Sequence, residues 1–356
     1  MDQNVDSSLF CNPLFHVRPV NLTFLFYVYH LMGIDEAVQS MSVKAVTSIG
    51  WQDNCSWEKL ASRNPVANET GYYYIEPDKM WRPLINLHSS PDVTPLDYNA
   101  NKILMGLYNN GRIEYAPLGT WTTSCSLDFR LYPFDKQSCN FIFEVWGPDR
   151  MINITFAELR FDSKISQHTF VWQAVDSSTE LSNTCFLVPS GETFCPSRVN
   201  FTIVAERTGN NQRVDLFITC FSLSLLMALT VTIPVDAPER VSYSVTLLLA
   251  LAILQFQIKS DIPKTTETII IVVYINANIL AGSIITAYTV LSLGIFMRIT
   301  EKLQQNSKID TDLKIRKANS IAKIFRFTDF IVFIFTTVVF FGLVLMLLIC
   351  FGTRSE

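Results

Sequence analysis

Four long apolar stretches, all in the second half of the chain, constrain this sequence more than any other feature. They are Leu216–Val235, Val241–Ile258, Ile269–Phe296 and Phe330–Phe351, and nothing before about residue 212 approaches their length. About 20 apolar residues are enough for a helix to cross a bilayer. We therefore predict a first domain of residues 1–212, and a membrane domain of residues 213–352 with helices at about 213–235, 239–260, 267–297 and 325–351.

The segment that joins the third and fourth of these helices, residues 298–324, indicates how the chain is oriented. From Arg298 to Arg326, just past this segment, the chain has eight Lys or Arg and three acidic residues. The stretch from Asp310 to Phe327 has the pattern of a basic helix that runs into the fourth span. Basic connectors stay in the cytoplasm. Four crossings then place both termini outside, in a multi-pass protein of the plasma membrane.

Sequence motifs in the first domain agree with an exterior location. Five Asn-x-Ser/Thr sequons occur there, at Asn21, Asn54, Asn68, Asn153 and Asn200, and such sequons are glycosylated only in secreted regions. No ordinary signal peptide is visible after Met1, which is followed by acidic and polar residues, and we expect the natural signal to lie outside this numbering. The stretch Leu22–Gly33 is rich in β-branched and aromatic residues and predicts a buried strand.

Six cysteines of this domain suit an oxidising compartment. The short local pairs Cys125–Cys139 and Cys185–Cys195 are favoured by proximity, which leaves Cys11 with Cys55. The sequence alone leaves open whether these last two are bonded or free.

The first domain reads as a β-sandwich. Short strand-like runs from Val20 to Arg207 are separated by turn signals such as Ser90-Pro91 and Asn109-Asn110-Gly111, and long amphipathic helical periods are scarce. Such a pattern favours a sandwich or barrel, which can form one domain of more than 200 residues.

The ring that a Cys125–Cys139 disulfide would close has an unusual interior. Closing a loop of this size removes unfolded-chain entropy worth roughly 3 kcal/mol, and Tyr132-Pro133 is a position where a cis peptide bond is affordable. The pattern Cys-x-Leu-x-Phe-x-x-Tyr-Pro-x-Asp-x-x-x-Cys resembles the signature of the Cys-loop receptors, the pentameric ligand-gated ion channels. With four membrane spans after it, the resemblance extends from about Val20 to Phe351.

The resemblance implies a small-molecule agonist site between neighbouring subunits. Trp146 matches the tryptophan of the family's loop B, and Trp81 matches the loop A motif, although we expect Trp81 itself in the core of the sandwich. In that motif His88 stands where many members carry tyrosine, and Val46 stands where cation-binding members carry an aromatic residue. These two residues argue against a quaternary ammonium agonist.

The loop C region departs from the acetylcholine-binding pattern. Cys185 and Cys195 are spaced apart, as in the second disulfide of glycine receptors, and no tyrosine lies between them. Phe186 or Phe194 is then the residue expected to close the agonist site.

The second span carries the predicted pore. Polar and apolar residues recur on one helical face at steps of three and four: Glu239, Ser242, Thr246, Leu249, Ile253, Gln257 (or Phe256) and Ser260. In a ring of five such helices, Glu239 would form an acidic ring that selects cations, and Leu249 with Ile253 would form apolar constrictions. Taken without the family pattern, Leu249 would fit ordinary packing against lipid.

The residues at the two ends of the second span bear on which inorganic ions the pore would select. The linker Val235–Val241 has the length and the glutamate of cation-selective members, whereas Pro238 resembles anion-selective ones. Lys259 at the outer end of the span would also disfavour cations if it faced the lumen. We expect a cation channel, with an anion channel of the same fold as the alternative.

The resemblance also predicts the parts that couple ligand binding to the pore. Phe134 at the tip of the ring should press on the linker Lys259–Thr268, with Pro263 beneath it. Glu36 and Arg207 match the family's buried ion pair.

Other functions fit the sequence less well. A net charge of −4 with no basic face argues against nucleic-acid binding. With four histidines, no catalytic triad order and no metal-ligand spacing, we expect neither an enzyme nor a cofactor or metal site. We expect a homopentamer, or assembly with related subunits, in contact with membrane lipid; a non-conducting receptor, or a subunit that conducts only with partners, remains a third reading.

Overall fold

The computed structural model describes residues 10–12, 19–91, 94–96, 103–146, 152–162, 171–183, 185–187, 191, 193–208, 210–261, 268–305 and 311–352. The chain divides into two compact units. The first comprises Met1–Leu127 and Lys136–Thr208, and the second comprises Asp128–Asp135 and Gly209–Glu356. The tip of the Cys125–Cys139 ring therefore groups with the helices, whereas its two cysteines group with the strands.

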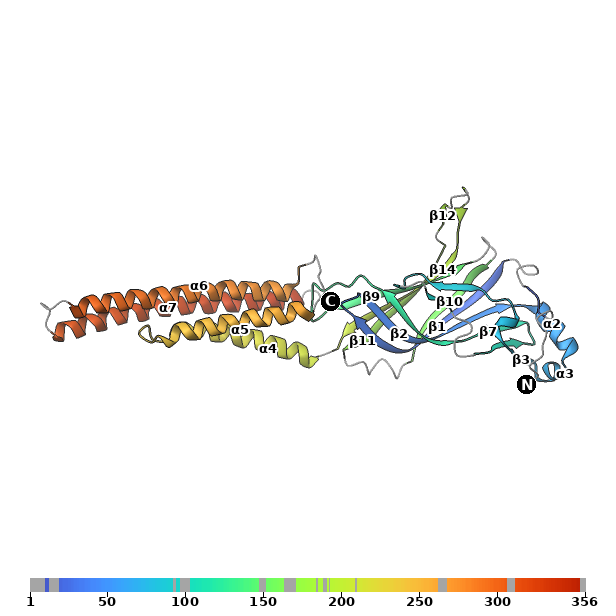
Figure 1. Ribbon diagram of the computed structural model, residues 1–356, viewed down its shortest axis with the longest axis horizontal. Coiled ribbons are helices and arrows are strands. Elements are labelled where there is room, and N and C mark those ends of the chain that lie inside the picture. The colour runs from blue at the N-terminus through green and yellow to red at the C-terminus, as the bar shows by residue number, and fades with distance from the viewer. Residues whose placement is uncertain are drawn as a thin grey trace. The chain divides into compact units, whose positions relative to one another are not determined.

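The first unit is a β-sandwich of two sheets (Figure 1). The seven-stranded sheet has the order β10-β1-β2-β7-β6-β3, with β8 also paired to β2. Its strands are β1 (Val20–Asp35), β2 (Ser40–Gln52), β3 (Tyr72–Ile75), β6 (Met105–Tyr108), β7 (Arg112–Tyr115), β8 (Leu118–Ser124) and β10 (Ile152–Phe161). The long strand β1 contains the whole stretch Leu22–Gly33, which is a strand as predicted.

The five-stranded sheet has the order β11-β14-β9-β4-β5. Its strands are β4 (Leu84–Leu87), β5 (Thr94–Pro95), β9 (Lys136–Trp146), β11 (Trp172–Asn183) and β14 (Ser197–Arg207). A separate hairpin of β12 (Phe186–Leu187) and β13 (Thr193–Phe194) stands off the sandwich beyond β14 (Figure 1).

Phenylalanines from both sheets form the core of the sandwich. Phe24 and Phe26 of β1 face Phe141 and Phe143 of β9 and Phe201 of β14, and all five side chains are fully buried. The ring centroids of Phe24 and Phe143 lie 5.0 Å apart, and those of Phe26 and Phe201 lie 5.3 Å apart. Because side chains alternate along a strand, the neighbouring residues of β9 and β14 face away from this core.

Two short helices were not predicted from the sequence. They are α2 (Asn54–Arg63) and α3 (Pro65–Thr70), which follow β2. Asp53 begins α2 as its N-cap, because its carboxylate accepts a hydrogen bond from the backbone N–H of Ser56 at 3.1 Å. The Asp-x-x-Ser spacing of this cap is visible in the sequence at Asp53 and Ser56.

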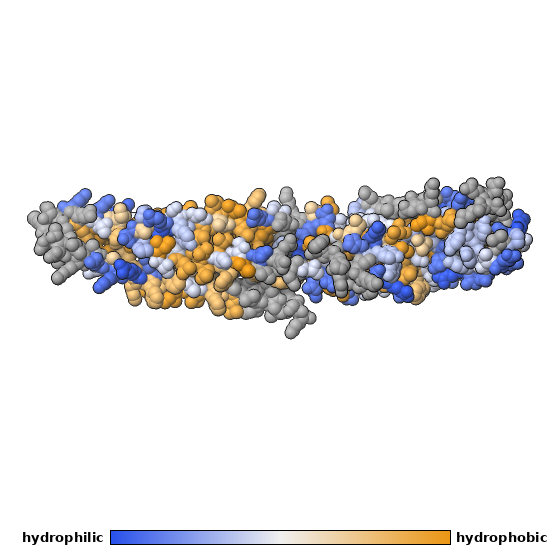
Figure 2. All heavy atoms as spheres, turned by 90° about the horizontal axis from the view of Figure 1, so that it is seen from below, coloured by the Kyte–Doolittle hydropathy of each residue, from blue (hydrophilic) through white to orange (hydrophobic). Residues whose placement is uncertain are grey.

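Four helices of the second unit are long and apolar enough to cross a membrane. They are α4 (Asn210–Leu229), α5 (Glu239–Asp261), α6 (Ile270–Gln305) and α7 (Thr311–Gly352). Apolar side chains dominate the visible surface over these helices (Figure 2). Their shared core comprises Met227, Ala228, Val231, Leu247, Leu251, Ile285 and Phe340.

Two helix boundaries differ from the predicted ones. The α4 helix ends at Leu229 and continues as a single 3-10 turn, Thr230–Thr232, because β-branched residues and Pro234 do not extend an α-helix well. The predicted connector 298–324 is largely helical, since α6 extends to Gln305 and α7 begins at Thr311. Its lysines and glutamines and Glu301 are good helix formers, and the sequence of this segment contains no proline or glycine.

Candidate functional site

Trp146 and His88 meet around a buried carboxylate that the sequence analysis did not single out. Glu144 lies two residues before Trp146 on β9, so both side chains point away from the phenylalanine core. Only 1% of the Glu144 side chain is exposed, whereas Trp146 is 41% exposed. The exposed indole therefore lies over a covered polar group.

The Glu144 carboxylate is held by three neighbours. Arg198, directly opposite on β14, approaches Oε1 with Nη2 at 2.7 Å and Nε at 2.8 Å. The Trp146 indole N–H donates to Oε2 at 3.1 Å, and Nδ1 of His88 lies 3.5 Å from the same oxygen. The backbone N–H of His88 donates to Ile142 O at 2.8 Å, which fixes the histidine beside β9.

This arrangement sets what the site can do. The negative charge of Glu144 is matched by Arg198, so the carboxylate is not a free counter-ion for a ligand. It orients the indole instead, because the hydrogen bond holds the edge of Trp146 and leaves its ring partly exposed. Arg198 was also missed from the sequence, although an arginine within the otherwise alternating apolar pattern of β14 was a visible signal.

Val46 is not brought to this cluster. It lies on β2 of the seven-stranded sheet, paired with Tyr27 of β1 and Leu118 of β8, whereas Trp146 and His88 belong to the other sheet. Desolvation and the nearby Asp162 carboxylate raise the pKa of Tyr27 above its usual value, so the phenol next to Val46 stays neutral. One protomer thus carries the two predicted halves of the site on different sheets.

The loop C region forms a small hairpin. The backbones of Phe186 and Phe194 pair across β12 and β13, and a disulfide joins Cys185 to Cys195.

Trp81 packs edge to face on Trp51, with ring centroids 5.9 Å apart, and its side chain is partly buried.

The predicted pore residues share one exposed face of α5. All seven of the residues from Glu239 to Ser260 are exposed in the protomer, with Leu249 at 59% and Ile253 at 52%. Opposite them, Ser244, Leu247 and Leu251 are buried. At about 100° per residue, the exposed and buried sets lie on roughly opposite sides of the helix.

The first turn of α5 is tied to α7 by a buried ion pair. Arg240, which is fully buried, donates to Asp329 at 2.8 and 3.3 Å, and the hydroxyl of Tyr288 donates to the same carboxylate at 2.8 Å. The Arg240 guanidinium also lies 5.7 Å from the centre of the Tyr288 ring. The residue next to Glu239 is therefore fixed to two other helices.

The coupling residues fall into two places. Within the first unit, Arg207 donates to Glu36 at 2.7 Å and its guanidinium lies 4.3 Å from the Trp172 ring centre. Within the second unit, the ring of Phe134 lies 5.5 Å from that of Phe217 on α4. Phe134 thus contacts a helix of the second unit. Its expected contact with Pro263 stays a prediction, because Pro263 lies outside the described residues.

The ring between Cys125 and Cys139 also reaches α6. The carbonyl of Arg130 accepts a hydrogen bond from the backbone N–H of Ile270, the first residue of that helix, at 3.2 Å. The disulfide of the ring is formed, the Tyr132-Pro133 bond is cis, and Cys11 is bonded to Cys55.

The predicted glycosylation sites differ in access. Asn21, Asn54 and Asn68 are exposed, whereas Asn153 and Asn200 lie partly buried within strands. The side-chain oxygen of Asn200 is buried and has no hydrogen-bond partner among the described atoms. Glycosylation stays a prediction, and side-chain exposure favours the first three positions.

Comparison with known proteins identifies the family of this chain. The family described as neurotransmitter-gated ion-channel ligand binding domain matches residues 9–208. The acetylcholine receptor subunit alpha-type acr-16 of Caenorhabditis elegans is 26% identical over 298 residues, which cover 80% of this chain and 56% of that protein.

More distant acetylcholine receptor subunits match as well. The human neuronal acetylcholine receptor subunit alpha-4 is 24% identical over 245 residues, covering 68% of this chain and 37% of that subunit. The beta-type subunit unc-29 of Caenorhabditis elegans is 24% identical over 275 residues, covering 75% of this chain and 52% of that subunit. The matched region thus covers between 37% and 56% of the length of these relatives. On the family match and the β-sandwich followed by four apolar helices, the chain belongs to the neurotransmitter-gated ion-channel receptors of the Cys-loop family.

Proposed function

We propose that this chain is a subunit of a pentameric ligand-gated channel for cations, opened by a small molecule that binds between subunits. Its relatives are named acetylcholine receptor subunits, and family members are receptors, not enzymes. The subunits would be identical or closely related, and the protein would lie in the plasma membrane with both termini outside.

The exposed stripe of α5 is the observation that carries this proposal. A helix of a four-helix unit normally buries one face against its neighbours, as α5 does with Ser244, Leu247 and Leu251. Its other face begins with Glu239 and continues through hydroxyl and then apolar side chains to Gln257 and Ser260. The carboxylate and the hydroxyl side chains of this face are costly against lipid and favourable around water, which supports a pore at a symmetry axis.

The placement of the ligand residues supports a site between subunits. Trp146 presents an exposed ring on one sheet, and Val46 lies on the other sheet of the same protomer. A neighbouring subunit could then bring its own Val46 face to the Trp146 of the first. Because Glu144 is neutralised by Arg198, the agonist would be recognised by the indole face and by His88 instead of by a free carboxylate.

Expression in oocytes under voltage clamp tests the channel. Application of candidate small molecules should open a current whose reversal potential moves when sodium is replaced by N-methyl-D-glucamine, and not when chloride is replaced by gluconate. Glu239→Gln should weaken cation selectivity, because it removes the charge of the proposed acidic ring. Glu301→Gln is the matched control, since Glu301 is exposed on α6 outside the stripe.

Two results would contradict the proposal. A reversal potential that follows chloride, unchanged in Glu239→Gln, would identify an anion channel. Surface-expressed protein that gives no current with any ligand or pH would favour a subunit that conducts only with different partners.

A further inference from the structure

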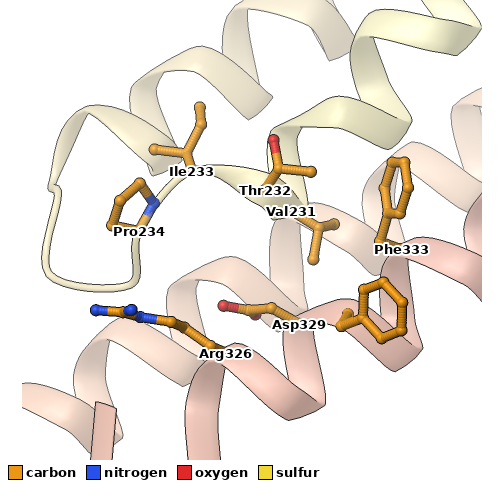
Figure 3. A pocket seen from close by; sticks show the side chains of 8 residues that line it. Val231, Thr232, Ile233, Pro234, Arg326, Asp329 and Phe333 are labelled. Atoms are coloured by element: carbon orange, nitrogen blue, oxygen red, sulfur yellow. The ribbon is translucent and has the colours of Figure 1, made fainter. Parts of the chain in front are cut away.

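Two places outside the candidate ligand site combine polar side chains with an unusual setting. One is a cavity of about 380 Å³ between α7 and the segment that joins α4 to α5, toward which Arg326 and Asp329 extend (Figure 3). The Asp329 carboxylate is bound by Arg240 and Tyr288, so it offers no free charge to a ligand. The other place is the sequon of Asn54, whose setting in the fold decides when it can be modified.

The sequon of Asn54 lies in the first turn of α2. Asn54, Cys55 and Ser56 are the first three residues of this helix. The side chain of Asn54 is exposed, whereas Ser56 is fully buried. Residues two positions apart point to different sides of a helix, but they point to the same side of an extended chain. The fold therefore hides the hydroxyl of this sequon and separates it from its asparagine.

The buried hydroxyl of Ser56 is engaged on both sides. It donates to Oδ2 of Asp53 at 2.6 Å, and it accepts a hydrogen bond from the backbone N–H of Cys11 at 2.8 Å. A serine hydroxyl has one proton to donate, and Asp53 receives it here. An enzyme that has to bind this hydroxyl would first have to open both contacts.

A disulfide holds the covering segment in place. Cys11 is 5% exposed and is bonded to Cys55, which is the middle residue of the sequon itself. The bond thus joins the segment that covers Ser56 directly to the acceptor motif. While it is closed, the sequon stays helical and its hydroxyl stays covered.

We propose that Asn54 accepts an N-linked oligosaccharide only while the Cys11–Cys55 disulfide is open, and that prompt closure of this disulfide keeps Asn54 unmodified in the native chain. A sequon requires Ser or Thr at its third position, so the modifying enzyme recognises the hydroxyl. That hydroxyl is accessible in the extended chain and is lost once Ser56 is buried on Asp53. The order of oxidation and glycosylation therefore decides the state of Asn54.

The two competing reactions belong to the same oxidising compartment. In glycosylation, the amide nitrogen of Asn54 bonds to C1 of the sugar, the bond from C1 to the diphosphate of a lipid-linked oligosaccharide breaks, and the amide proton goes to a base. In oxidation, the two thiols pass two protons and two electrons to the disulfide of another protein, which becomes a dithiol. The proposal requires only that the first unit is made in this compartment, and it does not depend on channel activity.

Asn68 provides an internal reference. Its sequon ends at Thr70, and both side chains are exposed. No cysteine lies within Asn68–Thr70. Modification of Asn68 should therefore not depend on the disulfide between Cys11 and Cys55.

Mass spectrometry of peptides from the full chain, expressed in secreting animal cells, measures both occupancies. An amidase that releases the sugar converts each modified asparagine to aspartate, and heavy-oxygen water marks the product. Asn54 should be largely unmodified in the native chain. Cys11→Ser, which leaves the sequon intact, should raise its occupancy several-fold and leave Asn68 unchanged. The total chain is analysed, so a variant that fails to reach the cell surface is still measured.

Two further variants separate the disulfide from other causes. Cys55→Ser opens the same bond and keeps the Asn-x-Ser pattern, so it should also raise the occupancy of Asn54. Cys185→Ser is the matched control, because it opens the disulfide of the β12–β13 hairpin, and it should leave Asn54 unmodified. A membrane-permeable thiol added during synthesis should raise the occupancy of Asn54 in the native chain.

Four results would overturn the proposal. The first is a native chain with a closed Cys11–Cys55 bond and a fully occupied Asn54. The second is an occupancy that stays low in Cys11→Ser. The third is an equal rise in Cys185→Ser, which would identify general misfolding as the cause. The last is a rise in Cys55→Ser alone, which would assign the effect to the middle residue of the sequon instead of the disulfide.

Discussion

At the scale of single residues, the candidate ligand-site cluster depends on one buried charge. Glu144 is surrounded by Arg198, Trp146 and His88, and it is almost completely removed from water. A carboxylate in such a position is stable only while its partners remain, since an unpaired buried charge is strongly destabilising. Trp146 owes its orientation to the same group, so the stability and the recognition properties of this patch are linked.

The sandwich should therefore unfold more easily when Arg198 is replaced. We expect Arg198→Ala to lower the free energy of unfolding by about 3 kcal/mol, at the lower end for a broken buried pair because the other neighbours of Glu144 remain. Tryptophan fluorescence of the full chain during denaturation measures this, because all six tryptophans precede residue 209. The signal thus reports on the first unit alone.

Arg160→Ala is the control for this measurement. Arg160 pairs with Glu158 on an exposed part of β10, where a surface ion pair contributes little. Equal effects of the two substitutions would show that Arg198 contributes no more than an exposed arginine.

At the scale of elements, the helices of the second unit are joined by polar ties as well as by apolar packing. Arg240 and Asp329 connect α5 with α7, and Tyr288 adds α6. A second polar group, Ser224 with Tyr274 and Asn278, connects α4 with α6. Buried polar contacts of this kind fix the register of helices that apolar packing alone would leave free to slide.

Replacing only one residue of the Arg240–Asp329 ion pair should destabilise the helices more than replacing both residues. Asp329→Asn leaves Arg240 buried without a counter-charge, and we expect the helices to lose about 3 to 5 kcal/mol of stability. The double substitution Arg240→Met with Asp329→Leu should recover most of this loss, because two apolar side chains can replace a buried pair. Thermal unfolding followed by far-ultraviolet circular dichroism reports the change.

Tryptophan fluorescence provides an internal reference for the same samples. The sandwich should unfold as in the native chain, because the tie lies wholly in the second unit. A double variant as unstable as Asp329→Asn would show that the bundle needs the ion pair itself.

At the scale of the whole molecule, assembly of several copies would account for the exposed stripe of α5. In a single protomer the side chains of Leu249 and Ile253 are exposed, and either lipid or water could contact them. Packing of several copies around an axis would enclose the stripe, with Glu239 at one end of the enclosed channel. The family of the chain makes five the expected number of copies.

Cysteine labelling distinguishes a water-filled stripe from a lipid-facing one. We expect Leu249→Cys to react with a charged methanethiosulfonate reagent, because the side chain would line the pore. Leu247→Cys, two residues away but only 8% exposed, should stay protected. Currents or mass shifts record the reaction.

Particle images of the purified assembly complete this test. They should show five-fold symmetry. An unreactive Leu249→Cys, or any other symmetry, would contradict the proposed pore.

The sequence by itself determined the features that are local along the chain. The four membrane helices follow from the length and apolarity of each stretch, and the strand β1 follows from its residues. The stripe of α5 could be recognised because helical periodicity belongs to one segment and needs no partner. The ring between Cys125 and Cys139 was identified for the same reason, since its motif is contiguous.

Only the tertiary structure decided which distant residues meet. Arg198 and Glu144 are 54 residues apart and become neighbours through the register of β14 with β9. Arg240 and Asp329 are 89 residues apart and meet because two helices pack side by side. Register and helix packing depend on the whole core, in which each side chain is positioned by all the others, so no local pattern could have predicted these contacts or the cavity beside them.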